Sequence, residues 1–346
     1  MKLKIGFIGF GKSTNRYHLP YVLLRDNIEV KKIYYRTRKK ELEERYERYN
    51  IEFTNDLLSL LEDEEIKLVS ICTPHGTHYE LAKLCLEHNK NVLVEKPFTT
   101  TLKEAEEILS LAEEKGLIAM PFQNRRFDSD FLALKYVITN KYVGDIVEVE
   151  SHFDYFRREY PDFNGKYYDG AFFGLGVHTV DQMVSLFGKP NKVYYDIRSI
   201  RNKNNPDDYY HVELFYGNFK AIVKTNHLVK SPYPKFILHG TKGSFIKYGI
   251  DKQEECLKAG MMPQDAGFGL DPEENYGKVI YVDDCGNDKE LIIKTPVGDY
   301  GKVYDNLYDA IVNKKEKLVS DFEILTVMEI LETGFKGENP RVHVFE

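Results

Sequence analysis

The sequence lacks several features that would place it in other classes of protein. It has no tryptophan and only four cysteines among 346 residues, and these cysteines form neither a CxxC pair nor a Cys/His metal spacing. Such sparse cysteine usage predicts reduced thiols and no metal site. No apolar run approaches the length that spans a membrane, and the chain starts directly in an apolar strand without a signal peptide. We therefore expect a cytoplasmic protein that binds no membrane.

The chain also lacks an excess of positive charge. Its 48 lysines and arginines are outnumbered by 55 aspartates and glutamates, which gives a formal net charge of −7. No basic stripe is present, so a nucleic-acid partner is not expected. The length suggests two domains, and the 42% hydrophobic content is sufficient for substantial cores.

The chain is organised around an N-terminal glycine turn. Residues 5–15, IGFIGFGKSTN, predict a short apolar strand, a tight turn and then a helix at about residues 15–24. Gly9 allows the sharp turn, and Gly11, without a side chain, lets a pyrophosphate approach backbone N–H groups. Thr14 stands where a third small residue is expected. This pattern predicts a dinucleotide site, although an ordinary glycine turn between packed elements is the alternative, because the motif is weak on its own.

The residues after the second strand indicate which cofactor is preferred. In an NAD-selective site, an acidic residue at the end of this strand holds the ribose 2′-hydroxyl. Here the strand at residues 29–35 is followed by Arg36 and Arg38, and these cations suit a 2′-phosphate. We therefore expect NADP(H), with NAD(H) as the alternative, and we include Lys12 and Ser13 of the glycine turn among the cofactor contacts. The simpler interpretation of the two arginines is a solvated helix start.

Residues 1–123 alternate short apolar runs with amphipathic helices, which is typical of a doubly wound parallel sheet. Further strands are expected at residues 51–53, 67–72, 91–95 and 117–121, with helices after residue 55, at 79–87 and after Thr101. Thr101 and Glu104 form a capping box for the last of these helices. This half is therefore predicted to be an NAD(P)-binding Rossmann domain.

Polar residues follow the strand at residues 67–72, at the edge where open α/β sheets bind ligands. These residues are Thr73, Pro74, His75 and His78. All four are candidate cofactor contacts, although helix capping explains the two histidines equally well.

Further polar residues follow the next two strands. Glu95 and Lys96 come directly before Pro97, which biases Lys96 to extended geometry. A lysine at this strand end is a functional candidate rather than an ordinary surface cation. Asn124 and Arg125 follow the last strand, and either contact a ligand there or tie the two domains together.

The pattern changes after residue 123, and residues 124–346 predict an α+β domain with a large, mostly antiparallel sheet. A helix is expected at residues 128–139, strands at 145–155, 192–200, 209–216, 219–228, 236–239 and 244–248, and helices at 302–312 and 322–335. Hairpin turns are indicated at residues 216–218 and 240–243. The open face of such a sheet needs a cover, so we expect a homo-oligomer, a dimer or tetramer, through this face.

A histidine-containing helix is predicted near residues 177–188. His178 and Asp181 are three residues apart on its polar side, so the carboxylate could orient the ring and stabilise its charged form. A catalytic role for His178 is predicted, although a helix cap or a packed side chain is the alternative.

Together these residues resemble the glucose–fructose oxidoreductase/inositol dehydrogenase (Gfo/Idh/MocA) oxidoreductases over essentially the whole chain. The resemblance rests on Gly9-x-Gly11, Thr73-Pro74-x-x-x-His78, Glu95-Lys96-Pro97, Asn124-Arg125-Arg126-Phe127 and Gly176-Val-His178-x-x-Asp181. Within the family, residues 244–254 are similar to NADP-dependent scyllo-inositol 2-dehydrogenase-like enzymes. The resemblance implies that Lys96 polarises the substrate oxygen and that His178 takes the hydroxyl proton. The family often has an aspartate at the position of Gly174, so that catalytic set is incomplete here.

The sequence therefore predicts an oxidoreductase that moves a hydride between NADP(H) and a secondary alcohol or ketone of a cyclitol or sugar-like polyol. Lys96, His178 and Asp181 are its candidate catalytic residues, and Lys96, His178 and Arg125 are also expected to contact the substrate. A sugar-facing wall is predicted from the aromatic and polar stretch that contains Tyr155, Arg157, Arg158, Tyr167 and Tyr168. Two alternatives remain: a non-catalytic, dinucleotide-binding regulator of the same fold, and a reductase of imines or enones.

Overall fold

The computed structural model describes residues 2–345, which form two compact units. The first unit contains the residues up to Asn124, together with Leu257–Pro263 and Asp299–Met328. The second contains Arg125–Cys256, Gln264–Gly298 and the residues from Glu329 onward. The chain thus returns twice to the first unit, with segments that the sequence analysis assigned to the second domain. The two units are described separately below.

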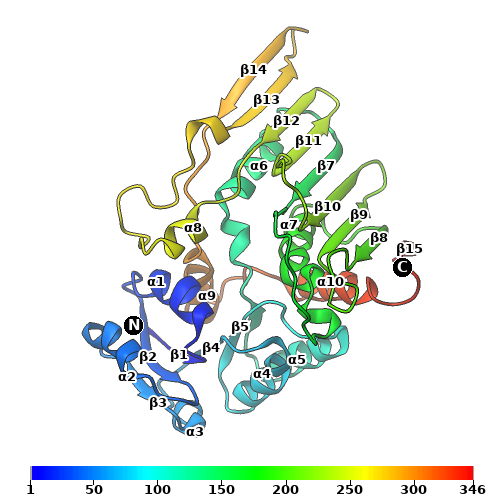
Figure 1. Cartoon of the computed structure of the whole chain (residues 1–346). Coiled ribbons are helices and arrows are strands. Elements are labelled where there is room, and N and C mark those ends of the chain that lie inside the picture. The colour runs from blue at the N-terminus through cyan, green and yellow to red at the C-terminus, as the bar shows by residue number, and fades with distance from the viewer. Residues whose placement is uncertain (1, 346) are drawn as a thin grey trace. The chain divides into compact units, whose positions relative to one another are not determined.

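The first unit is built on a sheet of six parallel strands in the order β3-β2-β1-β4-β5-β6 (Figure 1). The strands are β1 (Leu3–Ile8), β2 (Ile28–Tyr34), β3 (Glu52–Thr54), β4 (Leu68–Ile71), β5 (Asn91–Val94) and β6 (Ala119–Pro121). The strand order reverses between β1 and β4, and open α/β sheets bind ligands beyond the carboxyl ends of the strands at such a point. This topology confirms the predicted doubly wound sheet.

The central strands of this sheet are apolar because both of their faces are covered. Ile5, Phe7, Val69 and Leu93 are fully buried, on three neighbouring strands. Continuous apolar runs of this kind are typical of parallel strands between layers of helices. The helices of the unit are α1 (Leu19–Val22), α2 (Lys40–Glu43), α3 (Leu57–Leu61), α4 (His78–Glu87), α5 (Leu102–Glu114) and α9 (Lys302–Val312).

Two helix starts show how local sequence determines these elements. The capping box of α5 is present, because Thr101 accepts from the backbone of Glu104 while Glu104 accepts from the backbone of Thr101. The helix after the glycine turn differs from the expected 15–24, because a π-helical stretch, Thr14–His18, precedes the short α1. The wider π-helical turn places His18 in the core of the unit.

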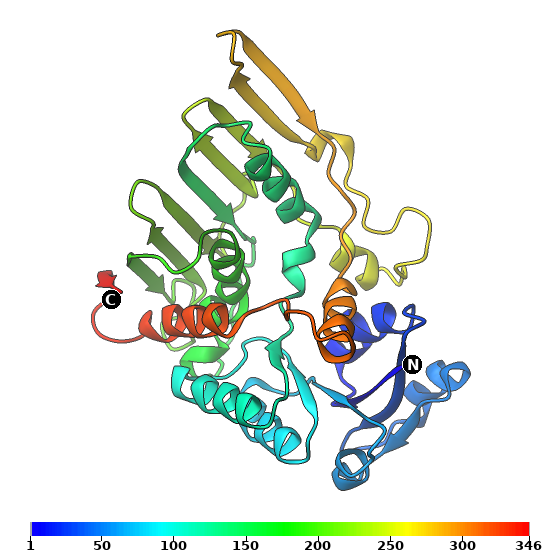
Figure 2. The same ribbon diagram turned by 180° about the vertical axis from the view of Figure 1, so that it is seen from behind.

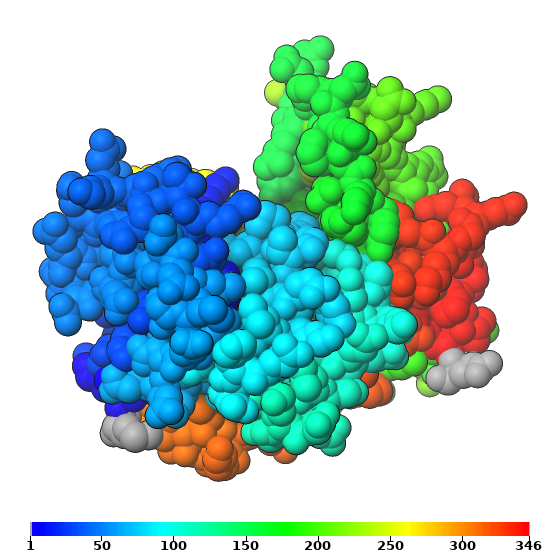
Figure 3. Space-filling view, turned by 90° about the horizontal axis from the view of Figure 1, so that it is seen from below, coloured from blue at the N-terminus to red at the C-terminus, as the bar shows by residue number. Residues whose placement is uncertain are grey.

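Helix α9 belongs to the first unit although it begins 178 residues after Asn124, where the main segment of that unit ends. Figure 2 shows this helix, in orange, beside the blue α1, and Figure 3 shows orange atoms at the surface next to blue and cyan ones. Arg25 donates to Asp299 at 2.5 Å and to Asp305 at 3.2 Å, and the rings of Tyr21 and Tyr300 lie 5.4 Å apart. These contacts fasten the returning segment to the first helix.

The second unit contains a nine-stranded sheet in the order β14-β13-β12-β11-β7-β10-β9-β8-β15. The strands are β7 (Ile146–His152), β8 (Lys192–Arg198), β9 (Tyr209–Phe215), β10 (Lys220–Asn226), β11 (Phe236–Gly240), β12 (Gly243–Lys247), β13 (Gly277–Val282), β14 (Asp288–Ile293) and β15 (Arg341–Val344). Only β7 and β10 pair in parallel, so the predicted, mostly antiparallel sheet is confirmed. Both predicted hairpins are present, as β9–β10 and β11–β12, whereas β13, β14 and β15 were not predicted.

Helices cover one face of the nine-stranded sheet, where α6 (Ser129–Thr139) and α7 (Val177–Phe187) are visible in Figure 2. Phe245 and Val279 are fully buried, whereas their neighbours Ile246 and Ile280 are exposed. Because side chains alternate between the two faces of a strand, exposed aliphatic residues lie on the other face of β12 and β13. The remaining helices are α8 (Gln253–Lys258) and α10 (Asp321–Thr333), within which the chain passes between the units.

The described residues contain no membrane-spanning helix, no metal-binding cluster and no disulfide. No helix within residues 2–345 is both long and apolar enough to cross a membrane. The same residues contain no group of three or more His, Cys, Asp or Glu side chains that could hold a metal ion. All four cysteines are free.

Candidate cofactor site and active-site residues

The glycine turn after β1 has the geometry that a dinucleotide requires. Gly9 has a φ of +105°, and a Cβ atom there would lie 2.3 Å from the carbonyl oxygen of Cys72, so only glycine fits. A Cβ atom at Gly11 would meet nothing within 4 Å, so the outer side of the turn is open. The open side and the backbone of the turn therefore suit a diphosphate group.

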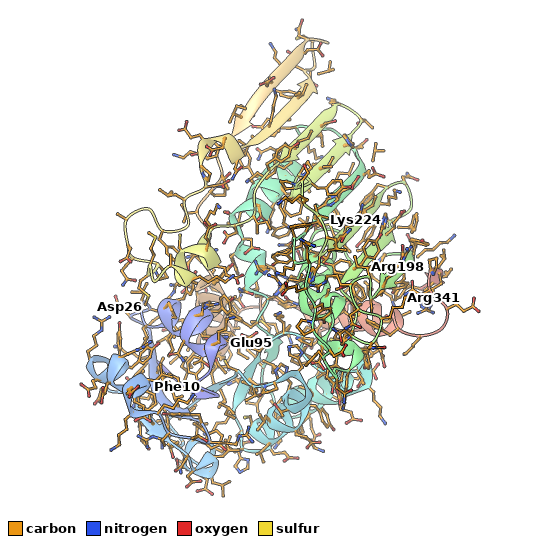
Figure 4. All side chains as sticks on the ribbon, viewed as in Figure 1. Phe10, Asp26, Glu95, Arg198, Lys224 and Arg341 are labelled. Atoms are coloured by element: carbon orange, nitrogen blue, oxygen red, sulfur yellow. The ribbon has the colours of Figure 1, made fainter. Side chains whose placement is uncertain are left out.

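A hydrogen bond and an aromatic contact hold the glycine turn in place. Thr14 is fully buried, and its hydroxyl donates to the carbonyl of Gly9 at 2.8 Å. Phe10, labelled in Figure 4, packs its ring against Tyr35 and Phe53, with ring centroids 5.1 and 5.0 Å apart. The threonine that departs from the usual glycine pattern thus stabilises the turn through a hydrogen bond of its own.

The two arginines after β2 have different surroundings. Arg38 donates through Nε and Nη2 to Glu43 and through Nη1 to the carbonyl of Phe53 at 2.9 Å. Arg36 is exposed, and no carboxylate within residues 2–345 forms a salt bridge with it. Of the two arginines, Arg36 is therefore the one that can take a phosphate without first losing a partner. Lys12 of the glycine turn is also exposed.

His78 lies behind the turns that follow β4 and β5. It is fully buried, and its two ring nitrogens lie 2.8 Å from the carbonyl oxygen of Pro97 and 2.9 Å from that of Thr73. Burial lowers the pKa of His78, while the two carbonyls oppose this because each favours an N–H. The ring links the turn after β4 to the turn after β5 through these two carbonyls. Any effect of His78 on a cofactor therefore acts through the backbone of the two turns. Pro74 is exposed and His75 half-buried, at the start of α4.

Glu95, labelled in Figure 4, connects the glycine turn to Lys96. Its carboxylate accepts from the hydroxyl of Ser13, from His18 Nε2 at 3.0 Å, and from the backbone N–H of Lys96 at 3.1 Å. Burial alone would raise the pKa of Glu95, but the hydrogen bond and charge of His18 outweigh it and lower the pKa to about 2. The carboxylate thus holds the main chain of Lys96 against the turn.

The hydrogen-bond network continues from Glu95 into the core of the first unit. His18 Nδ1 lies 2.7 Å from the hydroxyl of Tyr304 in α9, which is 3.3 Å from the hydroxyl of Ser70 in β4. The His18 ring is stacked on Phe122, with centroids 4.0 Å apart. The sequence analysis did not predict that His18 and Tyr304 support the site. The one local sign was that His18 lies on the apolar side of the first helix.

In the second unit, His178 is buried in the first turn of α7, after a π-helical stretch, Phe172–Gly176. Gly176 is required there, because a Cβ atom would lie 2.5 Å from the ring of Phe172. The carboxylate of Asp181 receives two hydrogen bonds from Arg126, both 2.8 Å long. Asp181 thus forms a bidentate ion pair with Arg126, and its expected role in orienting His178 stays a prediction.

Arg125 also bonds to residues of the second unit. Its guanidinium donates to Asp128 at 3.1 Å and to Glu254 at 2.8 Å, and its carbonyl accepts from Gln182 of α7 at 2.8 Å. The sequence left open whether Arg125 contacts a ligand or ties the two domains together; these bonds all lie within the second unit, so both alternatives stay predictions. Asn124, the last residue of the first unit's main segment, is buried.

The predicted sugar-facing wall divides into two parts. Tyr155 and Arg157 line a cavity of about 410 Å³ in the second unit, which also reaches Gly174. Tyr167 does not line this cavity, because its ring packs against Phe173 and Phe335 at centroid distances of 5.4 and 5.2 Å. Tyr168 and Arg158 are also absent from the lining. Tyr155 and Arg157 thus line this cavity and the other three residues do not, and the expected contact of the stretch with a sugar stays a prediction.

Comparison with known proteins identifies the family. Residues 3–123 match the family model described as "Oxidoreductase family, NAD-binding Rossmann fold", and residues 135–344 match its partner, "Oxidoreductase family, C-terminal alpha/beta domain". The chain belongs to the Gfo/Idh/MocA oxidoreductase family. The resemblance inferred from the sequence motifs is confirmed at this level.

Several members of the Gfo/Idh/MocA family are similar to this chain over nearly its whole length. An uncharacterised oxidoreductase of Escherichia coli, YhhX, is 54% identical over 98% of both chains. The scyllo-inositol 2-dehydrogenase (NADP(+)) IolW of Bacillus subtilis is 31% identical over 98% of this chain and 94% of its own. The crystal structure of an oxidoreductase from Bacillus cereus is 53% identical, covers 100% of this chain and 99% of its own, and has a TM-score of 0.98.

The chain is therefore an oxidoreductase of the Gfo/Idh/MocA family with an NAD(P)-binding Rossmann domain. Gly174 lies four residues before His178, where the family resemblance leads one to expect an aspartate. A Cβ atom at Gly174 would meet nothing within 4 Å, so packing does not require a glycine at this position. The space around Gly174 therefore does not exclude an aspartate at this position.

Proposed function

We propose that this protein is an NADP(H)-dependent oxidoreductase that interconverts a secondary alcohol and a ketone of a cyclitol or sugar-like polyol. The observation that carries the proposal is the position of Lys96, whose backbone is tied through Glu95 to the open glycine turn. A lysine beside a turn that suits a diphosphate supports hydride transfer between a dinucleotide and a substrate oxygen. The similarity to IolW, named as an NADP(+)-dependent scyllo-inositol dehydrogenase, supports the substrate class.

The proposed chemistry gives each residue a separate role. A bound nicotinamide supplies the hydride acceptor or donor. Lys96 stabilises the negative charge that develops on the substrate oxygen, and His178 exchanges the hydroxyl proton. Asp181 and Arg126 hold each other at one side of α7 and so keep the helix that carries His178 in place.

The proposal is tested by mixing the purified protein and NADPH with a panel of inososes and keto-sugars. We expect at least one member of the panel to be reduced with oxidation of NADPH, which is measured as the loss of nicotinamide absorbance. Turnover with NADPH is expected to be faster than with NADH. A panel of imines and enones serves as the comparison. Turnover confined to that second panel would contradict the polyol assignment.

The second candidate is a non-catalytic regulator that binds a dinucleotide, and Gly174 is the observation that favours it. Such a protein would bind NADPH, with a dissociation constant measurable by calorimetry, and would turn over no substrate. Lys96 and His178 argue against it, because a sensor of cofactor levels needs neither side chain.

The free cation at the end of β2 leads to a prediction on cofactor choice. Replacing Arg36 by alanine is expected to weaken NADPH binding by about tenfold, the effect of roughly 1.4 kcal/mol that a charge-assisted phosphate contact provides, and to leave NADH binding unchanged. Titration of both cofactors measures the ratio. Arg38→Ala is the matched control, because Glu43 already occupies that guanidinium. Equal losses for NADPH and NADH in the Arg36 variant would contradict a 2′-phosphate contact.

We also propose that the protein forms a homo-oligomer through the exposed face of the nine-stranded sheet. Ile246, Ile280 and Ile292 are exposed on three neighbouring strands. Ile280→Glu is expected to shift the mass measured by light scattering toward the monomer. A wild-type protein that is monomeric at working concentrations would refute this proposal.

A further inference from the structure

The side chain of Asn15 holds two carbonyl groups of the glycine turn. Its Nδ2 donates to the carbonyl oxygen of Phe10 at 3.1 Å and to that of Gly11 at 2.8 Å. The carbonyl of Gly11 also accepts from the backbone N–H of Asn15 at 3.2 Å. A single residue therefore fixes the direction of two consecutive carbonyl groups in the turn.

Tyr46 determines which end of the Asn15 amide faces the turn. The tyrosine hydroxyl donates to Oδ1 of Asn15 at 2.8 Å, so Oδ1 is occupied and Nδ2 is left for the two carbonyls. The opposite orientation of the amide would place Oδ1 against two carbonyl oxygens, which cannot donate. Burial raises the pKa of Tyr46 to about 12, so the hydroxyl keeps its proton at neutral pH and acts as a donor.

Tyr46 is distant from the turn in sequence but contacts it twice. It belongs to a 3-10 helix, Glu44–Tyr49, that follows α2. Besides its hydrogen bond to Asn15, its ring meets the ring of Phe10 edge-on, with centroids 5.7 Å apart. The ring contact does not involve the hydroxyl group, so Tyr46→Phe keeps the packing and removes only the hydrogen bond.

The two carbonyls held by Asn15 determine where two backbone N–H groups point. A peptide group is planar and trans, so its N–H points away from its C=O. The carbonyl of Phe10 shares a peptide group with the N–H of Gly11, and the carbonyl of Gly11 shares one with the N–H of Lys12. Because both carbonyls are turned toward Asn15, both N–H groups are turned away from it.

The N–H groups of Gly11 and Lys12 lie at the open part of the turn. A Cβ atom at Gly11 would meet nothing within 4 Å, and Lys12 is exposed. The N–H of Gly9, by contrast, is engaged, since it donates to the carbonyl of Tyr34 at 2.8 Å. Backbone N–H groups that already point in one direction suit phosphate oxygens, and binding then needs little reordering of the turn.

We propose that Asn15 is a positioning residue for the diphosphate of the dinucleotide, and that Tyr46 acts through it by fixing the orientation of its amide. The proposal rests on the dinucleotide site of the proposed function. In this role Asn15 does not contact the ligand. It keeps the carbonyls of Phe10 and Gly11 away from the phosphate oxygens and so directs the adjoining N–H groups at them. NADPH and NADH share the diphosphate, so Asn15 raises the affinity for both and does not discriminate between them.

The experiment measures the dissociation constants of NADPH, NADH and 2′-AMP, a fragment without a diphosphate, by calorimetric titration. Asn15→Leu has a similar size and no donor, and it is expected to weaken NADPH and NADH by the same factor, about tenfold, which corresponds to about 1.4 kcal/mol. The affinity for 2′-AMP is expected to change by less than about twofold, because a 2′-phosphate contact with Arg36 remains. Asn313→Ala is the matched control, since Asn313 is exposed and its Nδ2 donates to Asp309 within α9.

Tyr46→Phe tests whether the tyrosine acts through Asn15. Alone, it is expected to weaken both cofactors about threefold, and in the Asn15→Leu background it is expected to cause no further loss, because the hydroxyl no longer has an amide to orient. A structural role of Tyr46 that is independent of Asn15 would give the same loss in both backgrounds. Tyr49→Phe is the matched control, since the hydroxyl of Tyr49 accepts from Arg48 of the same 3-10 helix.

Three outcomes would overturn the proposal: unchanged affinities for NADPH and NADH in Asn15→Leu, an equal loss for 2′-AMP in that variant, and a loss from Tyr46→Phe that persists in the Asn15→Leu background. Where Asn15→Leu does not fold, Asn15→Asp replaces it, because a carboxylate keeps the bond from Tyr46 but cannot donate to the carbonyls. If the wild type binds NADH but neither NADPH nor 2′-AMP, the proposed NADP(H) preference fails, and the NADH titrations of the single and double variants still decide the role of Asn15.

Discussion

Replacing His178 by alanine is expected to lower kcat by about 10²–10⁴-fold, because a positioned general base contributes about that factor. The affinity for NADPH is expected to stay within threefold of the wild-type value, since the cofactor contacts we propose, at the glycine turn and the ends of β2 and β4, all lie in the first unit and His178 lies in the second. Steady-state kinetics with an inosose and NADPH measure kcat, and a fluorescence titration measures cofactor affinity.

Replacing Lys96 by alanine is expected to lower kcat by about 10²–10³-fold, because the ammonium stabilises charge that develops in the transition state. Lys96→Arg keeps a positive charge but changes its shape, so partial recovery is expected. The matched controls are Lys103→Ala, an exposed lysine of α5, and His239→Ala. Wild-type turnover in both the Lys96 and the His178 variants would show that these residues do not act on the substrate.

Replacing Glu95 by alanine is expected to cause a large loss of stability, about 3–5 kcal/mol in the free energy of unfolding. The reason is that removing one partner of a buried pair leaves the other, here His18, without its hydrogen bond. The same change frees Ser13 and the backbone N–H of Lys96, so kcat is expected to fall as well. Urea unfolding at pH 7 measures the first effect, and Glu106→Gln on the exposed side of α5 is the control.

The pH dependence of this stability follows from the lowered pKa of Glu95. Its pKa is about 2 in the folded chain, whereas the ordinary pKa of a glutamate is 4.5, so the unfolded state binds the proton more readily between these values. The stabilisation is therefore complete above pH 4.5 and is lost as the pH falls toward 2. In Glu95→Gln no such titration occurs, so the gap between the two proteins should narrow by about 2 kcal/mol between pH 7 and pH 3. A gap that is constant over this range would contradict the ion pair.

Much of the first unit could be predicted from the sequence because its signals are local. The apolar runs at residues 67–72 and 91–95 correspond to β4 and β5, and the capping box of Thr101 and Glu104 is present. The glycine turn after β1 also has its expected shape, with a positive φ at Gly9 that glycine readily adopts. Such signals involve residues that are a few positions apart, so they are visible before any tertiary contact is known.

The contacts that position the candidate site could not be predicted in the same way. Tyr304 reaches His18 across 286 residues, and Arg126 holds Asp181 across 55. Each pairing gives a buried polar group its hydrogen-bond partner. Local sequence does not show which of the chain's many arginines, tyrosines and carboxylates will be that partner. Local sequence also does not show that packing leaves His227 Nε2 and Asp207 Oδ1 without hydrogen-bond partners among residues 2–345.

The sequence by itself determined the parallel and antiparallel sheets, the glycine turn and the residue types at the strand ends, because period, turn chemistry and capping act over short distances. Only the tertiary structure decided that α9 returns to the first unit, that Arg38 is occupied while Arg36 is available, and that Tyr167 packs while Tyr155 faces a cavity. These outcomes depend on which distant groups share a buried volume. Which groups meet there depends on the packing of the whole chain, because most buried polar groups need a hydrogen-bond partner and that partner is often distant in sequence.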